Sequence, residues 1–288
     1  MDVDISIIIV SWNVRERLEP NLQQIFSLPC KYTVEVFVVD NGSKDGSAKM
    51  VREKFPQVNL IQNDWDAGFA GPNNQALRLA KGKVILLLNP DMLIQEGALD
   101  RTYELLTQEK KIGVLGIRLN NEFGKPIGSV RRLPTLGSQL AVILKLARFF
   151  PSIISFYMYE DFDYSKSQEV PQVRGSYFSF RRELLDTVGY LDDRYHIWFE
   201  EVDYCRRVTK QGLSIFYEAS VCCQDFVGCG FAKMKHLEKQ FIFTDSMRYY
   251  FWKWHPWWQA ILISFARPIG IMFAAFADIF ERVFKKKV

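Results

Sequence analysis

ISIIIVSWN, residues 5–13, decides the fold of this chain. The run 5–10 is short, continuous and rich in β-branched residues, which is typical of a strand buried on both faces of a parallel sheet. Polar residues end the run, and apolar residues at positions 18, 22, 25 and 26 then recur at helical spacing before Pro29. The stretch therefore predicts a buried strand that leads directly into a helix.

This strand-and-helix pattern repeats through the first 112 residues. Further strands are expected at 34–39, 58–61 and 84–88, with helices at 47–55 and from about 70 to 80. Short right-handed crossovers build an open, mostly parallel sheet with helices on both faces, so the expected fold class is α/β, Rossmann-like. A length of 288 residues at 48% hydrophobic content suffices for one large domain with an appendage.

The ends of the expected strands are polar, which predicts a ligand site at the carboxyl edge of the sheet. Asn13, Asp40, Asn63, Asn89 and Asp91 would gather there. The first strand-to-helix turn, 11–16, contains no glycine. Because a dinucleotide fold or a P-loop needs glycines at this turn to bring phosphate to the backbone amides, NAD-dependent chemistry and P-loop ATP hydrolysis are excluded.

The net charge of +4 lies entirely in the last 48 residues, which leaves the first 240 neutral overall. A nucleic-acid-binding protein needs a basic stripe on its folded body, so this class is excluded. The chain has five cysteines, an odd number, and no secretion signal is visible at its start. These features predict a protein of the reducing cytosol.

Five segments of the chain resemble, in order and spacing, the family 2 glycosyltransferases of GT-A fold. They are VSWN (10–13), VVDNGSKDGS (38–47), NDWDAGFAGPNN (63–74), LLLNPDM (86–92) and WFEEVDYCRR (198–207). The resemblance covers about residues 3 to 231 and is greatest to the rhamnosyltransferase-like branch, which assembles bacterial surface polysaccharides. It implies transfer of a sugar, with inversion, from a nucleotide-diphosphate donor to an acceptor hydroxyl, assisted by Mg²⁺ or Mn²⁺.

The resemblance also implies roles for individual residues. Asp40 would hold the nucleotide base, Asp91 would bind the metal in place of the family's D-x-D motif, and Glu201 would be the catalytic base. Glu200 and Asp203 are alternative bases. The donor-binding set comprises Trp12, Asn13, Asp40, Asn41, Gly68, Asn74, Asn89, Arg132, Gly175 and Arg206.

The required chemistry supports these assignments. A departing nucleotide diphosphate gains negative charge, and a hard cation held by a carboxylate such as Asp91 stabilises that charge. A general base must take the proton of the acceptor hydroxyl, and the apolar Trp198 and Phe199 beside Glu201 favour a raised proton affinity. In a simpler interpretation, Asn89-Pro90-Asp91 only caps a helix, and the acids only begin a helix from about 202 to 212.

Arginine pairs at 131–132 and 206–207 are candidates for bidentate contacts with a diphosphate or a charged acceptor, although both pairs can equally be surface residues. The chain departs from the family near position 223, where a metal-binding histidine is usual. Cys223 and Gln224 stand there, and Asp225 is the candidate that replaces the histidine.

A zinc site is not expected from the cysteines. Cys222, Cys223 and Cys229, together with His236, lack the C-x-x-C pairs that direct two thiolates at one ion. Buried free thiols are the expected state.

The last 48 residues differ from the rest, since fourteen of them are aromatic. We therefore divide the chain into a catalytic domain, 1–240, and a helical segment, 241–288. Within the domain, 1–112 forms the nucleotide-binding half and 113–240 the half that carries the acceptor site and the base. Tryptophans and terminal lysines flank the apolar stretch of the helical segment, which is typical of a membrane interface. Arg267 and Pro268 disfavour a single span, because Pro268 is expected to break the helix.

We expect one or two helices lying in the plane of the cytoplasmic leaflet. The alternative is a helical cap that packs on the catalytic domain or on a second copy in a homodimer. The whole pattern predicts a peripheral enzyme on the inner face of a bacterial membrane, which uses dTDP-rhamnose or a UDP-hexose to extend a glycan on a polyprenyl-type lipid carrier. Competing functions are sugar nucleotidyl transfer, for which 11–17 lacks the glycine-rich basic loop, and non-catalytic binding of a nucleotide or glycan.

Overall fold

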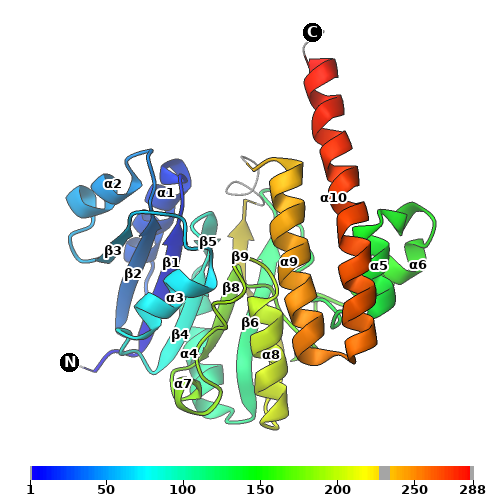
Figure 1. The fold of residues 1–288 in the computed structure, drawn as a ribbon. Helices are drawn as coiled ribbons and strands as arrows, with labels where there is room; N and C mark the ends of the chain where they lie inside the picture. The colour runs from blue at the N-terminus through cyan, green and yellow to red at the C-terminus, as the bar shows by residue number, and fades with distance from the viewer. Residues whose placement is uncertain (1, 227–233, 286–288) are drawn as a thin grey trace.

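A computed structural model describes residues 2–226 and 234–285, with side chains up to residue 279. Its first half alternates strands and helices as expected, which confirms the α/β class (Figure 1). The elements are β1 (Ile5–Ser11), α1 (Arg15–Ser27), β2 (Val34–Asn41), α2 (Ser47–Lys54), β3 (Asn59–Asn63), α3 (Ala70–Leu77) and β4 (Val84–Leu88).

The second half is less regular. Its elements are β5 (Met92–Ile94), α4 (Ala98–Gln108), β6 (Ile112–Asn120), α5 (Leu136–Ile143), a 3₁₀ turn (Leu146–Arg148), α6 (Pro151–Met158), β7 (Gln168–Glu169), β8 (Tyr177–Arg181), α7 (Leu184–Thr187), α8 (Glu200–Lys210), β9 (Ser214–Asp225), α9 (His236–Trp254) and α10 (Trp257–Lys285).

The strands form one sheet in the order β3-β2-β1-β4-β8-β6-β9-β5, with β7 paired to β9. The four N-terminal strands are parallel, and β6 is parallel to β9. β8 runs antiparallel between β4 and β6, and β5 runs antiparallel to β9. The sheet is therefore mostly parallel, and the carboxyl ends of β1, β2, β3 and β4 lie along one edge.

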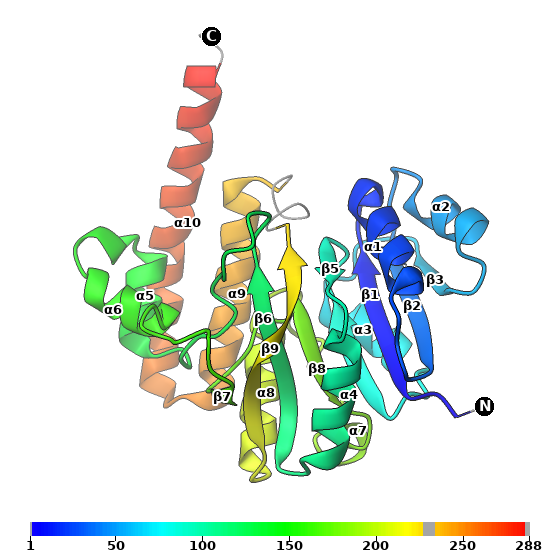
Figure 2. The same cartoon turned by 180° about the vertical axis from the view of Figure 1, so that it is seen from behind.

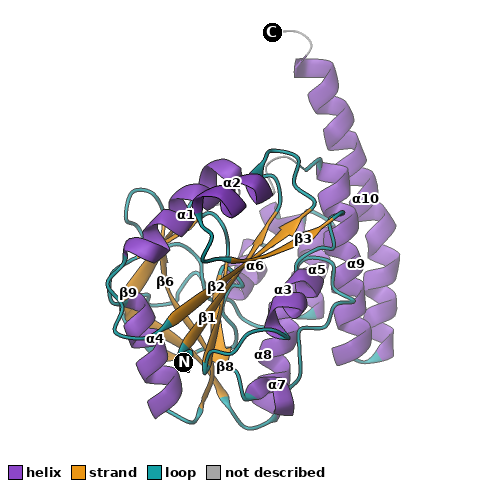
Figure 3. Ribbon diagram, turned by 90° about the vertical axis from the view of Figure 1, so that its left-hand side faces the viewer, coloured by secondary structure: helices purple, strands orange, loops and turns teal. Residues whose placement is uncertain are grey.

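The two faces of the sheet carry separate cores, because alternate residues of a strand point to opposite sides. Ile8 packs with residues of α3 and α8, whereas its neighbours Ile7 and Ile9 pack with α1, α2 and α4. Figure 2 shows α1 and α4 on the back of the sheet, and Figure 3 shows helices on both sides of it. Five consecutive buried residues in β4 fit this arrangement, since both faces are covered.

A third core attaches the C-terminal helices to the α/β body. Met247, Tyr250 and Phe251 of α9 and Ile263 of α10 pack against residues of α5, α8 and the loop before α8. Helix α9 begins at His236, a few residues before the division expected at 240. The alternative of a helical cap on the catalytic domain is thus part of the observed fold.

Pro268 does not break the last helix, in contrast to our expectation. Helix α10 runs without interruption from Trp257 to Lys285 and reaches past the carboxyl edge of the sheet (Figure 1). The helix is packed on both sides of the proline, since Ile263 and Ala266 are buried before it and Ala274 is buried after it. This packing outweighs the single backbone hydrogen bond that proline removes.

Candidate active site

Polar groups meet at the carboxyl edge, as the strand ends predicted. Strand register pairs Ser11 with Asp40 and Asn41 with Asn63. The N–H of Asn13 donates to Ser43 Oγ at 2.9 Å, so the loops after β1 and β2 lie together. The N–H of Asn89 donates to the carbonyl of Ser176 at 3.0 Å. The ends of β1, β2 and β4 therefore form one polar surface next to the start of β8.

Asp40 lies at this surface, near the end of β2, and is fully buried. Its Oδ2 accepts a hydrogen bond from Ser43 N–H at 3.0 Å, whereas its Oδ1 has no partner among the described residues. A buried acceptor without a donor is ready for a ring N–H of a base. Trp12 is half-buried at the end of β1. Asn41 is buried and donates to Asp66 and to the Gly68 carbonyl at 3.0 and 2.7 Å, so it shapes the loop that carries Gly68.

Gly68 lies against the loop before α8. It has φ +77°, and a Cβ at this position would lie 2.2 Å from the carbonyl oxygen of His196. The next residue, Phe69, donates its N–H to the same oxygen at 2.7 Å. Glycine is required here both by its dihedral angle and by the close approach of the two chains. The loops 64–69 and 194–199 are consequently held together.

Two carboxylates lie where a cation could be held. Asp91 lies in the short link between β4 and β5, immediately before Met92, and Asp225 faces Met92 across the β5–β9 pair. Asp225 is buried, burial raises the pKa of its carboxyl group, and its Oδ2 accepts no hydrogen bond. The positive charge of Arg174, whose Nη1 is 3.3 Å from that oxygen, opposes the shift of the pKa.

These residues fit a Mg²⁺ or Mn²⁺ ion that keeps several waters and binds substrate phosphates, because such ions need only one or two protein carboxylates. They do not form an all-protein metal site, since the described residues contain no cluster of three or more His, Cys, Asp or Glu side chains suited to a metal. Cys223 is a buried free thiol on β9, as expected, whereas Cys222 is free but only partly buried, and Cys229 lies outside the described residues.

Glu200 and Glu201 open helix α8 behind a strained turn. Trp198 and Phe199 both have positive φ, +68° and +73°, although neither is glycine. Such strain persists where surrounding structure fixes it, and here Ser246 of α9 donates to the Ile197 carbonyl at 2.9 Å. The turn aims the Glu201 side chain at Gly175, where an added Cβ would lie 3.8 Å from that of Glu201.

The two glutamates have different electrostatic environments. Burial, together with the charge of Glu201, raises the pKa of Glu200 well above its ordinary value. Burial also raises the pKa of Glu201, but the positive charges of Arg131 and Arg174 oppose this shift. Both glutamates have a buried Oε2 without a hydrogen-bond partner in the described structure. The pKa of Glu201 is thus opposed by nearby positive charge in a way that the pKa of Glu200 is not, which favours Glu201 over Glu200 as a candidate base.

Asp203, the third candidate base, points away from this site. It is fully buried and binds Lys253 Nζ at 2.6 Å, Trp254 Nε1 at 2.7 Å and Arg207 Nε at 2.9 Å. Its Oδ1 faces Lys253 and Trp254 and its Oδ2 faces Arg207, so donors of the protein already engage both oxygens. Its position gives Asp203 a structural role between α8 and α9.

Three of the expected donor-binding residues also lie elsewhere. Asn74 is buried and exchanges hydrogen bonds with the backbone of Leu191, at 2.8 and 3.1 Å. Arg206 lies over the rings of Tyr250 and Trp254 on α9. Arg132 pairs with Asp161 at 3.2 Å and stacks on Tyr159. The spacing of these residues along the chain gave no sign that tertiary partners occupy their side chains.

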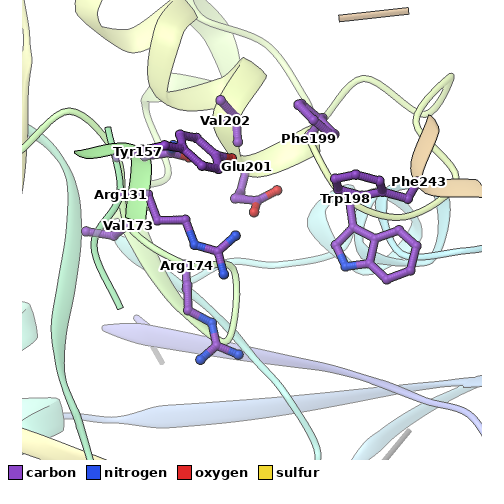
Figure 4. Close-up of a pocket in the computed structure, with 10 residues that line it drawn as sticks. Arg131, Tyr157, Val173, Arg174, Trp198, Phe199, Glu201, Val202 and Phe243 are labelled. Atoms are coloured by element: carbon purple, nitrogen blue, oxygen red, sulfur yellow. The ribbon is translucent and has the colours of Figure 1, made fainter. Parts of the chain in front are cut away.

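Two cavities share Glu201 as a wall. The inner cavity is lined by Asn89, Gly175, Ser176 and Glu200, and the outer one by Tyr157, Val202, Phe199 and Phe243. Arg131, Arg174, Trp198 and Glu201 line both. Figure 4 shows the two arginines on one side of the Glu201 carboxylate and Trp198 with Phe243 on the other.

Arg174, Tyr157 and Phe243 were missing from the sequence-based site. Only Arg174 had a signal, because it directly precedes Gly175 of the expected donor-binding set. Tyr157 and Phe243 lie on α6 and α9 and reach the site only through tertiary packing.

Comparison with known proteins agrees with the fold. A family model described as glycosyl transferase family 2 matches residues 6–189. The chain is 26% identical over 226 residues to an N-acetylglucosaminyl-diphospho-decaprenol L-rhamnosyltransferase of Mycobacterium tuberculosis, which covers 73% of this chain and 72% of that protein. It is 23% identical over 216 residues to a low-salt glycan biosynthesis hexosyltransferase of Haloferax volcanii, covering 74% of this chain and 64% of that protein.

Among solved structures, a mannosyltransferase from Pyrobaculum calidifontis in complex with GDP-Man and Mn²⁺ has a similar fold, with a TM-score of 0.60 and 19% identity over 98% of this chain and 76% of that one. The fold and the family match define a glycosyltransferase of GT-A fold. The chain belongs to glycosyl transferase family 2, as the five sequence segments predicted.

Proposed function

We propose that this glycosyltransferase transfers a sugar, with inversion, from a nucleotide diphosphate to a lipid-linked acceptor in the synthesis of a cell-surface glycan. The observation that carries the proposal is that Glu201, the base candidate, shares one cavity with Asn89 and Gly175 at the carboxyl edge, close to the end of β4. Residues 1–112 would hold the nucleotide, and 113–240 would supply the base and the acceptor site.

In the proposed reaction the Glu201 carboxylate takes the proton of the acceptor hydroxyl. The oxygen forms a bond to the anomeric carbon while the bond from that carbon to the diphosphate breaks, so the configuration inverts. Asp91 and Asp225 would hold a Mg²⁺ or Mn²⁺ ion, which stabilises the negative charge of the departing diphosphate. Asp40 would accept the ring N–H of the base.

The sugar and acceptor classes rest on the relatives. One relative is named as a rhamnosyltransferase acting on a diphospho-decaprenol, and another as a glucosyltransferase that uses UDP-glucose with a diphosphoundecaprenol acceptor. We infer from these names a dTDP-rhamnose or UDP-hexose donor and a polyprenyl-diphosphate acceptor. The first relative covers most of both chains, whereas the second matches only 30% of this chain.

Membrane association through the C-terminal helices is the second part of the proposal. Among the described residues one helix, α10, contains a stretch long and apolar enough to cross a membrane, Trp257–Ile279, and 28% of that stretch is buried. The large residues that its outer face exposes are all apolar. They are Trp257, Trp258, Leu262, Phe265, Ile269, Met272, Phe273, Phe276 and Ile279. Four more exposed apolar residues lie on or just before α6: Phe149, Phe150, Ile153 and Phe156.

Polar contacts between α9 and α10 favour an orientation along the membrane over a single span. Arg267 lies 3.4 Å from Asp245, and Asp278 accepts the N–H groups of His236 and Leu237 at 3.2 and 3.1 Å. A solitary span of α10 would break these contacts and place Arg267 in lipid, at a cost of about 2.5 to 3.5 kcal/mol for the arginine alone. The proposed enzyme therefore lies on the cytoplasmic leaflet with the outer face of α10 in the lipid.

The test measures thermal unfolding with UDP, dTDP and GDP, each with and without Mn²⁺, followed by hydrolysis of the matching nucleotide sugars. Stabilisation by one nucleotide that depends on the metal is expected, and the corresponding donor should be hydrolysed slowly without an acceptor. Metal-independent stabilisation without any donor hydrolysis would favour a nucleotide-binding protein over an enzyme.

A further inference from the structure

The outer cavity beside Glu201 has one cationic wall and one aromatic wall. Arg131 and Arg174 form the first, and Trp198 and Phe243 form the second (Figure 4). Most of the remaining lining is apolar and includes Val202 and Phe199. A cavity of this kind suits a ligand with an anionic group and an apolar or sugar surface, because guanidinium groups bind phosphate and aromatic rings pack on both other surfaces.

A short strand-like contact positions both arginines. Val130 pairs with Val173 in an isolated antiparallel bridge, and the N–H of Arg174 donates to the carbonyl of Ser129 at 2.9 Å. Residues that flank a bridged pair point to the face opposite that pair. Arg131 and Arg174 consequently leave the same face of this contact, toward Glu201.

The two arginines have different existing partners. Arg174 is already paired with Asp225 on the metal side. Arg131 has no salt bridge to a carboxylate among the described residues, and its buried Nε lacks a hydrogen-bond partner there. Its charge acts on both Glu201 and the Tyr157 hydroxyl, so it lies between the base and the wall provided by α6. Arg131 is the cation that has the larger unused capacity for an anion.

The direction of the reaction identifies the source of that anion. In an inverting displacement the attacking hydroxyl and the departing diphosphate lie on opposite sides of the transferred sugar. The diphosphate of the donor belongs beside Asp91, which follows β4. Groups around Glu201 on the side of α6 and α9 therefore face the acceptor.

We propose that Arg131, assisted by Arg174, binds the diphosphate of the acceptor in this outer cavity, while Trp198 and Phe243 pack on the part of the acceptor next to it. This inference rests on the proposed function and adds the determinant that selects a diphosphate-linked acceptor over a neutral glycan. The cavity also adjoins the exposed apolar residues of α6. Tyr157 lines the cavity, and its neighbour in the chain, Phe156, is exposed. A polyprenyl chain leaving the cavity would meet this surface.

The experiment is a calorimetric titration of the full chain with geranyl diphosphate and, separately, with geraniol. The donor site is first saturated with Mn²⁺ and whichever nucleoside diphosphate stabilises the protein, or left empty if none does. Wild-type protein should bind geranyl diphosphate at least tenfold more tightly than geraniol. Arg131→Gln should remove most of this difference, and Arg131→Lys, which keeps the charge but not the planar fork, should lie between the two.

The matched control is Arg182→Gln. Arg182 is exposed and directly follows β8, at the opposite end of that strand from Tyr177. It should bind both probes as the wild type does, and the affinity for the nucleoside diphosphate should be unchanged in every variant. Thermal unfolding of each variant checks that it is folded. If Arg131→Gln does not fold, Arg131→Lys still tests the inference.

Three results would overturn the inference. The first is a wild type that does not discriminate between the probes, and the second is Arg131 variants that bind geranyl diphosphate normally, which would leave Arg131 only the role of a partner for Glu201. The third is a loss of nucleotide affinity in Arg131→Gln with unchanged probe binding, which would assign the arginine to the donor. None of these results depends on turnover, so failure of the proposed function is recognised separately, by absent donor hydrolysis.

Discussion

Lys253 Nζ lies 2.6 Å from Asp203 Oδ1, and this contact joins the C-terminal helix α9 to the helix that carries Glu201. Lys253 also lies 2.7 Å from Asp192, and Asp203 is fully buried. Removal of one partner from a buried pair leaves an uncompensated charge. The contact therefore fixes the catalytic helix and the C-terminal helices as one unit.

Lys253→Met should lower the free energy of unfolding by about 3 to 5 kcal/mol, because Asp203 then stays buried with less positive charge around it. Urea unfolding followed by circular dichroism measures the change. Arg248→Met, on the same helix, removes an exposed pair with Asp245 and should cost at most about 1 kcal/mol. Equal effects of the two substitutions would contradict a structural role for the Lys253–Asp203 contact.

Glu201→Gln should lower kcat about 10² to 10⁴-fold, because glutamine cannot accept the proton of the acceptor hydroxyl. Affinity for the donor nucleotide should remain, which equilibrium titration checks. Asp203→Asn makes a useful contrast, since its effect should be a loss of stability with kcat of the folded fraction largely kept. If Glu201→Gln turns over at the wild-type rate, Glu201 is not the catalytic base.

The rate should fall as the pH is lowered. Burial raises the pKa of Glu201 above its ordinary value of 4.5, and the base works only when it is ionised. As the pH falls through this raised pKa, the ionised fraction and kcat/KM should decrease together. Arg131→Gln removes a positive charge that favours the ionised form of Glu201. This variant should therefore show the decrease of kcat/KM at a higher pH than the wild type.

Glu200→Gln should stabilise the protein increasingly as the pH rises. The pKa of Glu200 is raised in the folded state, so its stabilising contribution is present below the unfolded pKa of about 4.5 and is lost as the pH rises through the folded pKa. Glutamine resembles the protonated acid and escapes this loss. Each tenfold difference in proton affinity is worth about 1.4 kcal/mol, measured as the gap between the unfolding free energies of variant and wild type at pH 5 and pH 8.

The sequence predicted the first half of the fold well because its signals are local. The four runs around Ile7, Val36, Leu60 and Leu86 are each a strand, and their polar ends give the carboxyl edge. Short buried runs bounded by polar turns need no tertiary information to be recognised. The positions of Asp40, Asn89 and Asp91 follow directly from this topology.

The second half and the outer cavity depend on contacts that local patterns do not contain. Strand β9 extends from Ser214 to Asp225, because pairing with β5 and β6 supports a sequence of mixed polarity. Asp203 and Arg206 match the expected motif by position, yet their side chains bind α9, a helix more than 30 residues away. Spacing identifies which residues form a motif but not which way each side chain points on a helix.

Asp91→Asn should abolish the Mn²⁺-dependent part of the stabilisation by the donor nucleotide. A ligand at about 100 times its Kd stabilises a folded protein by about 2.7 kcal/mol, so the loss is measurable as a lower melting temperature. Asp225→Asn should give a smaller loss, because Arg174 already neutralises part of its charge. The exposed Asp193→Asn is the control. If Asp91→Asn leaves the Mn²⁺-dependent stabilisation unchanged, residues other than Asp91 bind the metal.

The double variant Phe265→Ser/Phe276→Ser should reduce binding to anionic phospholipid vesicles by at least tenfold. The two rings are 73% and 62% exposed on the outer face of α10, and burial of each in lipid is worth about 1.5 to 3 kcal/mol. Substitution is a sharper test than deletion of the C-terminal helices, because Met247, Tyr250 and Phe251 of α9 belong to the core. Vesicle flotation measures binding. The matched control is Leu79→Ser, because Leu79 is 55% exposed but lies outside the C-terminal helices. If flotation is unchanged while sedimentation reveals a dimer of the wild type that the double variant dissociates, the outer face of α10 joins two copies of the enzyme and the proposed membrane contact is wrong.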